Sequence, residues 1–220
     1  ERIAFLADEL TRYQDAAYAG RYRDLVATVR AAEARAMGPG VERLAWAATE
    51  NLYKVMAIKD EYEVARLYAD PAFKAKLAEQ FEGVDKIRVM LAPPLIARHD
   101  PATGRPRKIA FGPWIFGAFR LLAGLKGLRG GMFDVFARTG ERRAERALRE
   151  DYAADLQRLA RDLTPANHGL AVEIARVPET VKGYGPVKEA NMARAAKRRE
   201  GLVERFAAGP AVRPVLVAAE

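Results

Sequence analysis

Residues 139–163 read TGERRAERALREDYAADLQRLARDL, and this stretch decides the fold class. Apolar residues recur along it every three or four positions, which is the spacing of one face of an α-helix. These residues are Ala144, Leu148, Tyr152, Leu156, Leu159 and Leu163. Thr139 precedes the first turn, where its hydroxyl can accept a hydrogen bond from a backbone amide and act as an N-cap. The stretch therefore predicts a long helix with one buried face.

The sequence before this stretch carries the same helical spacing. We expect a first helix from the start of the chain to about residue 36, ended by Gly38-Pro39-Gly40. A second helix is expected over about residues 41–69. Asp70-Pro71 then predicts the cap and the first residue of a short third helix, because proline lacks the amide hydrogen that a first helical residue leaves unused.

The middle of the chain interrupts this helical rhythm. Residues 86–91 alternate polar and apolar side chains, as a half-buried strand does, and residues 108–111 provide a returning strand. A turn signal at residues 100–104 separates them. We therefore expect a small β-hairpin insert near residues 86–111. Residues 114–125 follow as a helix that is apolar on all sides, which indicates burial in the core or against a partner.

The sequence after residue 163 returns to helices. Thr164-Pro165 predicts the start of a helix that ends near Val177-Pro178. Another helix is expected from Pro186 to about Phe206, and residues 207–220 are expected to form an extended or mobile tail. The predicted fold class is mainly α, with a single multi-helix domain over residues 1–206 that contains the hairpin insert.

The composition restricts the chemistry available to this chain. It contains no Cys and no Ser, which excludes disulfides, zinc–thiolate sites and Cys-ligated clusters and removes the two commonest nucleophiles. The only histidines are His99, expected to be exposed in a turn, and His168, expected to help satisfy the start of its helix. No set of three or four residues has metal-ligand spacing. We therefore expect no catalytic residues and no metal site.

The net charge of +8 would attract phosphate-rich partners. However, the acidic residues are interleaved with the basic ones through most of the chain. Asp60, Glu61 and Glu63 are expected to form ion pairs with Lys59 and Arg66, because residues three and four apart meet on a helix surface. The charged residues are therefore interpreted mainly as ion-paired side chains on solvent-exposed helix faces.

A basic run near the C-terminal end has two interpretations. Arg194, Lys197, Arg198 and Arg199 could touch nucleic acid, but the run lacks interleaved aromatic residues, so a solvated face or a partner contact is favoured. No uninterrupted apolar run approaches the ~20 residues of a membrane-spanning helix. The sequence opens on Glu1 in a helical pattern, and we expect a cytoplasmic protein that is a piece of a longer polypeptide.

A glycine-rich segment at residues 124–131 reads GLKGLRGG. Glycines let backbone amides approach an anion closely, and Lys126 and Arg129 add positive charge. The segment lacks the order of a phosphate-binding P-loop and follows a helix rather than a strand. A tight connection between packed helices is therefore favoured, and a grip on a phosphate or on a carboxylate of a neighbouring domain is the alternative.

Several strings resemble the C-terminal domain of the fused indolepyruvate ferredoxin oxidoreductases, in the same order along the chain. They are KDEYEVARLY at 59–68, DPAF at 70–73, LAPP at 91–94, FGPW at 111–114, LKGLRG at 125–130, FD at 133–134, ERR at 141–143, TPANH at 164–168 and VKEAN at 187–191. The resemblance covers about residues 10–206. It implies a parent enzyme that decarboxylates aryl-pyruvates oxidatively to acyl-coenzyme A and passes the electrons to ferredoxin.

The resemblance also implies which cofactors the parent uses. These are thiamine diphosphate with Mg²⁺, iron–sulfur clusters and coenzyme A, all bound by other domains. The chain itself would be an accessory domain that binds no cofactor and packs on the catalytic domains or stabilises a homodimer. The expected interface comprises Trp114, Ile115, Phe116 and Phe119. A sharper hypothesis assigns a coenzyme A phosphate or partner contact to Lys126, Arg129, Arg142 and Arg143. The alternative to an accessory domain is a stand-alone basic adaptor or nucleic-acid-binding protein.

Overall fold

The computed structural model of this protein describes residues 1–82, 87–93, 98, 100 and 107–209. Within it the chain divides into two compact units. Unit 1 comprises Glu1–Ala57 and Arg143–Glu220, and unit 2 comprises Ile58–Arg142. Unit 2 is therefore an insertion in the sequence of unit 1. The single domain expected over residues 1–206 stays a prediction.

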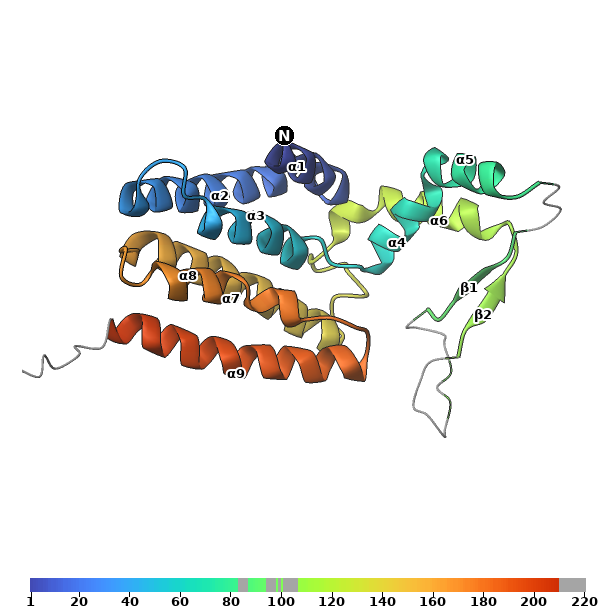
Figure 1. Ribbon diagram of the computed structural model, residues 1–220. Coiled ribbons are helices and arrows are strands. Elements are labelled where there is room, and N and C mark those ends of the chain that lie inside the picture. The colour runs from blue at the N-terminus through green and yellow to red at the C-terminus, as the bar shows by residue number, and fades with distance from the viewer. Residues whose placement is uncertain (83–86, 94–97, 99, 101–106, 210–220) are drawn as a thin grey trace, which may run out of the picture. The chain divides into compact units, whose positions relative to one another are not determined.

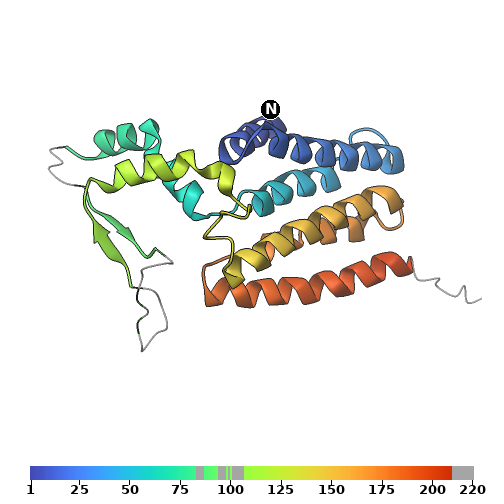
Figure 2. The same ribbon diagram turned by 180° about the vertical axis from the view of Figure 1, so that it is seen from behind.

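Unit 1 is built from helices (Figures 1 and 2). Their bounds are α1 Arg2–Tyr13, α2 Ala16–Met37, α3 Arg43–Met56, α7 Gly140–Asp162, α8 His168–Ala175, the 3-10 helix η2 Val177–Thr180 and α9 Pro186–Ala208. Helix α3 packs against both α2 and α8, and α9 packs against α8 and η2. None of the described helices is long and apolar enough to cross a lipid bilayer.

The core of unit 1 is apolar and includes buried tyrosines whose hydroxyls are hydrogen-bonded. Leu52, Leu156 and many other aliphatic side chains are fully buried in one continuous cluster. The buried Tyr22 donates its hydroxyl to the Thr49 carbonyl at 3.1 Å. The buried Tyr152 donates to the Ala175 carbonyl at 2.7 Å. These hydrogen bonds offset the cost of taking the hydroxyl groups out of water.

Two of the predicted helices are wrong in extent, because each is broken by an aspartate. The helix expected over residues 1–36 ends at Tyr13 and restarts at Ala16. Between them the Asp15 carboxylate accepts a hydrogen bond from the Tyr18 amide at 2.7 Å and caps α2. The helix expected over residues 41–69 is broken in the same way at Asp60. An aspartate side chain offers the backbone an alternative to helical hydrogen bonds, so the helix restarts there.

The predicted starts of the other helices are mostly confirmed. Pro71 is the first residue of its helix, Thr139 accepts from the Arg142 amide at 3.3 Å, and Pro186 opens α9. The helix predicted from Thr164 begins instead at His168. Asn167 accounts for the delay, because its side chain accepts from the Thr164 amide at 2.8 Å and holds a turn ahead of the helix.

Unit 2 combines short helices with a hairpin. Its elements are α4 Glu61–Ala69, α5 Pro71–Gln80, β1 Val89–Leu91, β2 Ile109–Phe111, α6 Ile115–Gly124 and the 3-10 helix η1 Lys126–Leu128. The strands pair antiparallel, with Val89 opposite Phe111. The predicted mainly α fold with a small β-hairpin is confirmed. The turn expected at residues 101–104, His99 and residues 210–220 of the expected tail lie outside the described residues, and α9 extends to Ala208.

The core of unit 2 is small. Helices α4 and α6 pack together, and the buried cluster comprises Ala65, Val89, Ile115, Phe116 and Phe119. The Tyr68 and Phe119 rings stack at the edge of this cluster, with centroids 5.1 Å apart. Because so few side chains of unit 2 are buried, the polar contacts at the start of α4 are expected to contribute a larger share of its stability.

Candidate functional site

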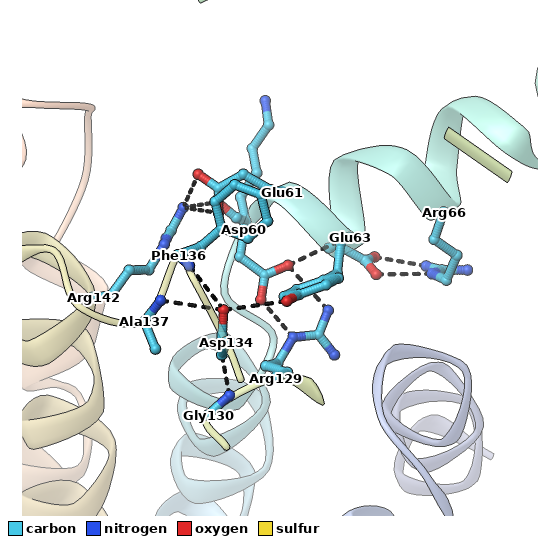
Figure 3. A network of polar contacts seen from close by, with 12 residues as sticks. Asp60, Glu61, Glu63, Arg66, Arg129, Gly130, Asp134, Phe136, Ala137 and Arg142 are labelled. Atoms are coloured by element: carbon cyan, nitrogen blue, oxygen red, sulfur yellow. Dashed lines mark hydrogen bonds and ion pairs between the residues drawn. The ribbon is translucent and has the colours of Figure 1, made fainter. Parts of the chain in front are cut away.

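The Asp134 side chain organises the loop that follows η1 in unit 2. Asp134 is 5% exposed, and its carboxylate accepts hydrogen bonds from the amides of Gly130, Phe136 and Ala137 at 2.7, 3.0 and 3.2 Å (Figure 3). Gly130 has a φ of +74°, a conformation that side-chain-bearing residues rarely adopt. The backbone amides of this loop thus surround an anion, and that anion is the chain's own carboxylate.

Tyr62 completes the surroundings of Asp134. Its hydroxyl donates to Asp134 Oδ1 at 3.2 Å, and its ring meets the Phe136 ring edge-on at 5.5 Å. Burial, and then the negative charge of Asp134, raise the pKa of Tyr62 to about 12. Tyr62 therefore remains a neutral hydrogen-bond donor at physiological pH.

A buried ion pair joins the start of α4 to the same loop. Asp60 caps α4 by accepting from the Glu63 amide at 2.8 Å, and it also pairs with Arg129, whose Nη2 lies 3.0 Å from Oδ1. The Arg129 side chain is 12% exposed, and its guanidinium lies 5.5 Å from the centroid of the Tyr62 ring. Arg129 is thus neutralised and packed inside unit 2 (Figure 3).

The acidic cluster at the start of α4 forms ion pairs, as expected. Glu63 pairs with the expected partner Arg66 at 2.7 Å. Glu61 pairs with Arg142, whose Nη2 lies 3.3 Å from both carboxylate oxygens and donates to the Lys59 carbonyl at 3.2 Å. These contacts join residues near the two ends of unit 2.

The four residues assigned to a coenzyme A or partner contact differ in their surroundings. Arg129 and Arg142 face carboxylates of the chain itself, as described above. Lys126 lies in η1 and is half-buried, while Arg143 is exposed and belongs to unit 1. A phosphate that approached either arginine would compete with Asp60 or Glu61 for it, and the coenzyme A contact stays a prediction. The favoured interpretation of the glycine-rich segment, a tight connection, agrees with this geometry.

The expected interface residues have divided roles. Ile115, Phe116 and Phe119 are buried in the core of unit 2, so they are not available to a partner. Trp114 is 66% exposed and is the member of this set that points outward. The exposed apolar residues of α6 are others, chiefly Leu121 at 71%.

A buried histidine–glutamate pair in unit 1 is the polar site that sequence reasoning missed. His168 Nε2 lies 2.7 Å from Glu33 Oε1, with the side chains 6% and 0% exposed. Glu33 also accepts from the amides of Leu44 and Ala45, each at 2.7 Å, at the start of α3. The carboxylate lies at a helix N-terminus, where the helix dipole favours negative charge.

The geometry of this pair favours a structural role. His168 was expected to help its own helix start, but it instead supports the carboxylate that caps another helix. Both side chains are almost completely buried, so a substrate has no access to them. A signal existed in the sequence, since Glu33 continues the helical stripe of Val26 and Val29, where a charged residue needs buried partners.

The basic run on α9 is partly neutralised. Arg199 pairs with Asp155, with its Nη2 2.9 Å from Oδ1, and Asp155 is 2% exposed. Arg194 donates to Asn191 at 2.6 Å. Lys197 and Arg198 are exposed. This arrangement agrees with a solvated helix face.

The fold and these contacts define a mainly helical protein whose polar clusters hold its own backbone in place. Across the described residues, no group of three or more His, Asp or Glu side chains is arranged to hold a metal ion. A family model described as "Family of unknown function (DUF6537)" matches residues 1–201, so the chain belongs to that family. No curated protein matches the chain, and no solved structure does.

Proposed function

We propose that this chain is a non-catalytic accessory domain of an indolepyruvate ferredoxin oxidoreductase-like enzyme, and that it packs on the catalytic domains through unit 2. The ordered strings shared with that family's C-terminal domain support the parent. In this proposal the parent is cytoplasmic and homodimeric, and its thiamine diphosphate, Mg²⁺, iron–sulfur clusters and coenzyme A are bound by the other domains. This chain contributes shape and a contact surface.

The single observation that carries the docking role is the apolar surface of unit 2. Among the described residues, unit 2 exposes more large apolar side chains than it buries. The exposed ones are Leu67, Phe81, Met90, Ile109, Trp114, Leu121, Leu125, Leu128, Met132, Phe133 and Val135. Leaving apolar side chains in water is unfavourable, so their excess on unit 2 supports a contact with a partner.

Unit 1 provides an internal comparison. It is the longer unit, yet its exposed large apolar residues are only Phe5, Trp46, Tyr184 and Val187 among those described. Its core is a single extensive cluster. The contrast supports a division in which unit 1 is the stable scaffold and unit 2 is the part that contacts a partner.

The test uses the complete polypeptide encoded by the reading frame that contains Glu1. Thiamine-binding and cluster-binding sequence is expected upstream of Glu1. The purified polypeptide should reduce ferredoxin with indolepyruvate and coenzyme A, and the 220-residue chain alone should not. Turnover of a 2-oxoacid by the isolated chain, or a complete polypeptide without this activity, would refute the proposal.

The adaptor alternative is tested in parallel with the isolated chain. Binding to duplex or single-stranded DNA that weakens by roughly 10³-fold between 50 and 200 mM salt would favour a nucleic-acid role, because such binding releases counterions. The pairing of Arg199 with Asp155 leaves less positive charge on α9 for that purpose. We therefore expect weak binding that shows no preference between the two DNA forms.

A further inference from the structure

We draw no further inference here: the strongest candidate, the cluster of Lys54, Lys182 and Lys188 beside the N-terminal end of α9 in unit 1, carries nothing because Lys54 already donates to the Pro178 carbonyl at 2.6 Å, Lys188 already pairs with the buried Glu145, and no second observation among the described residues points to an anion bound there.

Discussion

Replacing Glu33 by alanine should destabilise unit 1 by several kcal/mol without touching unit 2. Glu33 is fully buried and accepts three hydrogen bonds, from the Leu44 amide, the Ala45 amide and His168 Nε2, each at 2.7 Å. Alanine removes the acceptor and leaves all three donors in the interior. The perturbation therefore acts on one carboxylate that joins α2, α3 and α8.

The expected magnitude follows from the cost of unpaired buried groups. Each buried donor left without a partner costs about 1–3 kcal/mol, and the loss of a helix cap alone costs about 1 kcal/mol. Because the helix start can relax and admit some water, we expect a loss of about 3–6 kcal/mol for Glu33→Ala. Glu33→Gln keeps one acceptor oxygen and should lose about half as much. Total stabilities of ~5–15 kcal/mol make either change large.

The two tryptophans allow each unit to be followed separately, since Trp46 lies in unit 1 and Trp114 in unit 2. Urea unfolding of Glu33→Ala in a Trp114→Phe background reports unit 1 through Trp46 fluorescence, with helical circular dichroism as a second probe. In a Trp46→Phe background, Trp114 reports unit 2. Glu204→Ala, at an exposed glutamate of α9, is the matched control and should change stability by less than about 0.5 kcal/mol.

Three results would contradict this account of Glu33. One is a Glu33→Ala midpoint equal to that of Glu204→Ala. Another is an equal loss for Glu33→Ala and Glu33→Gln, which would show that the acceptor oxygens are not what matters. The third is a larger shift of the urea unfolding midpoint reported by Trp114 than of the midpoint reported by Trp46. That result would mean that Glu33 stabilises unit 2 rather than unit 1.

Three further predictions concern single contacts. Gly130→Ala should destabilise unit 2 by about 1–2 kcal/mol through its positive φ alone, since an added Cβ meets no atom within 4 Å; an unchanged Trp114 unfolding midpoint would contradict this. Unit 2 should lose stability as pH rises from about 10 towards about 12, because the raised pKa of Tyr62 means that the folded state holds the phenol proton more tightly than the unfolded state. Urea unfolding at several pH values measures this loss. Tyr62→Phe should remove that part of the pH dependence. Arg199→Met should cost about 3 kcal/mol by leaving the buried Asp155 unpaired, and Asp155→Leu combined with Arg199→Met should recover much of it in the same assay.

The parts of the fold that the sequence predicted correctly are those set by local chemistry. Thr139, Pro71 and Pro186 act on amides within a few residues of themselves, so their positions alone identify helix starts. The strand pair near residues 86–111 was visible because alternation of side chains is also a local property.

The helix breaks at Asp15 and Asp60 were missed for a related reason. The apolar spacing continues across each break, and periodicity cannot distinguish one long helix from two helices whose faces happen to align. The aspartate itself was the available signal, because Asp is a preferred N-cap residue. Its carboxylate accepts a hydrogen bond from the backbone amide three residues later, as Asp15 and Asp60 do here. The break at Asp60 lies close to the boundary between the two units, which is at Ile58.

The candidate sites depended on contacts between residues distant in sequence, which no local pattern reveals. Glu33 and His168 are separated by 135 positions, and Arg129 lies 69 positions from Asp60. The alternative interpretation of the glycine-rich segment expected Arg129 to contact an anion. That anion proved to be internal, and only the three-dimensional arrangement could supply that fact.

The contact between Arg142 and Lys59 has a consequence for the order of folding. It fastens the exit of unit 2 to its entrance, so the long insertion is a closed loop once unit 2 has formed. The entropy of closing a flexible loop grows with its length, by about 0.6 kcal/mol for each doubling. Once that loop is closed, α3 and α7 are connected as closely as two helices joined by a short turn. Bringing the two sequence segments of unit 1 together then costs little more loop-closure entropy than a contact between neighbouring helices.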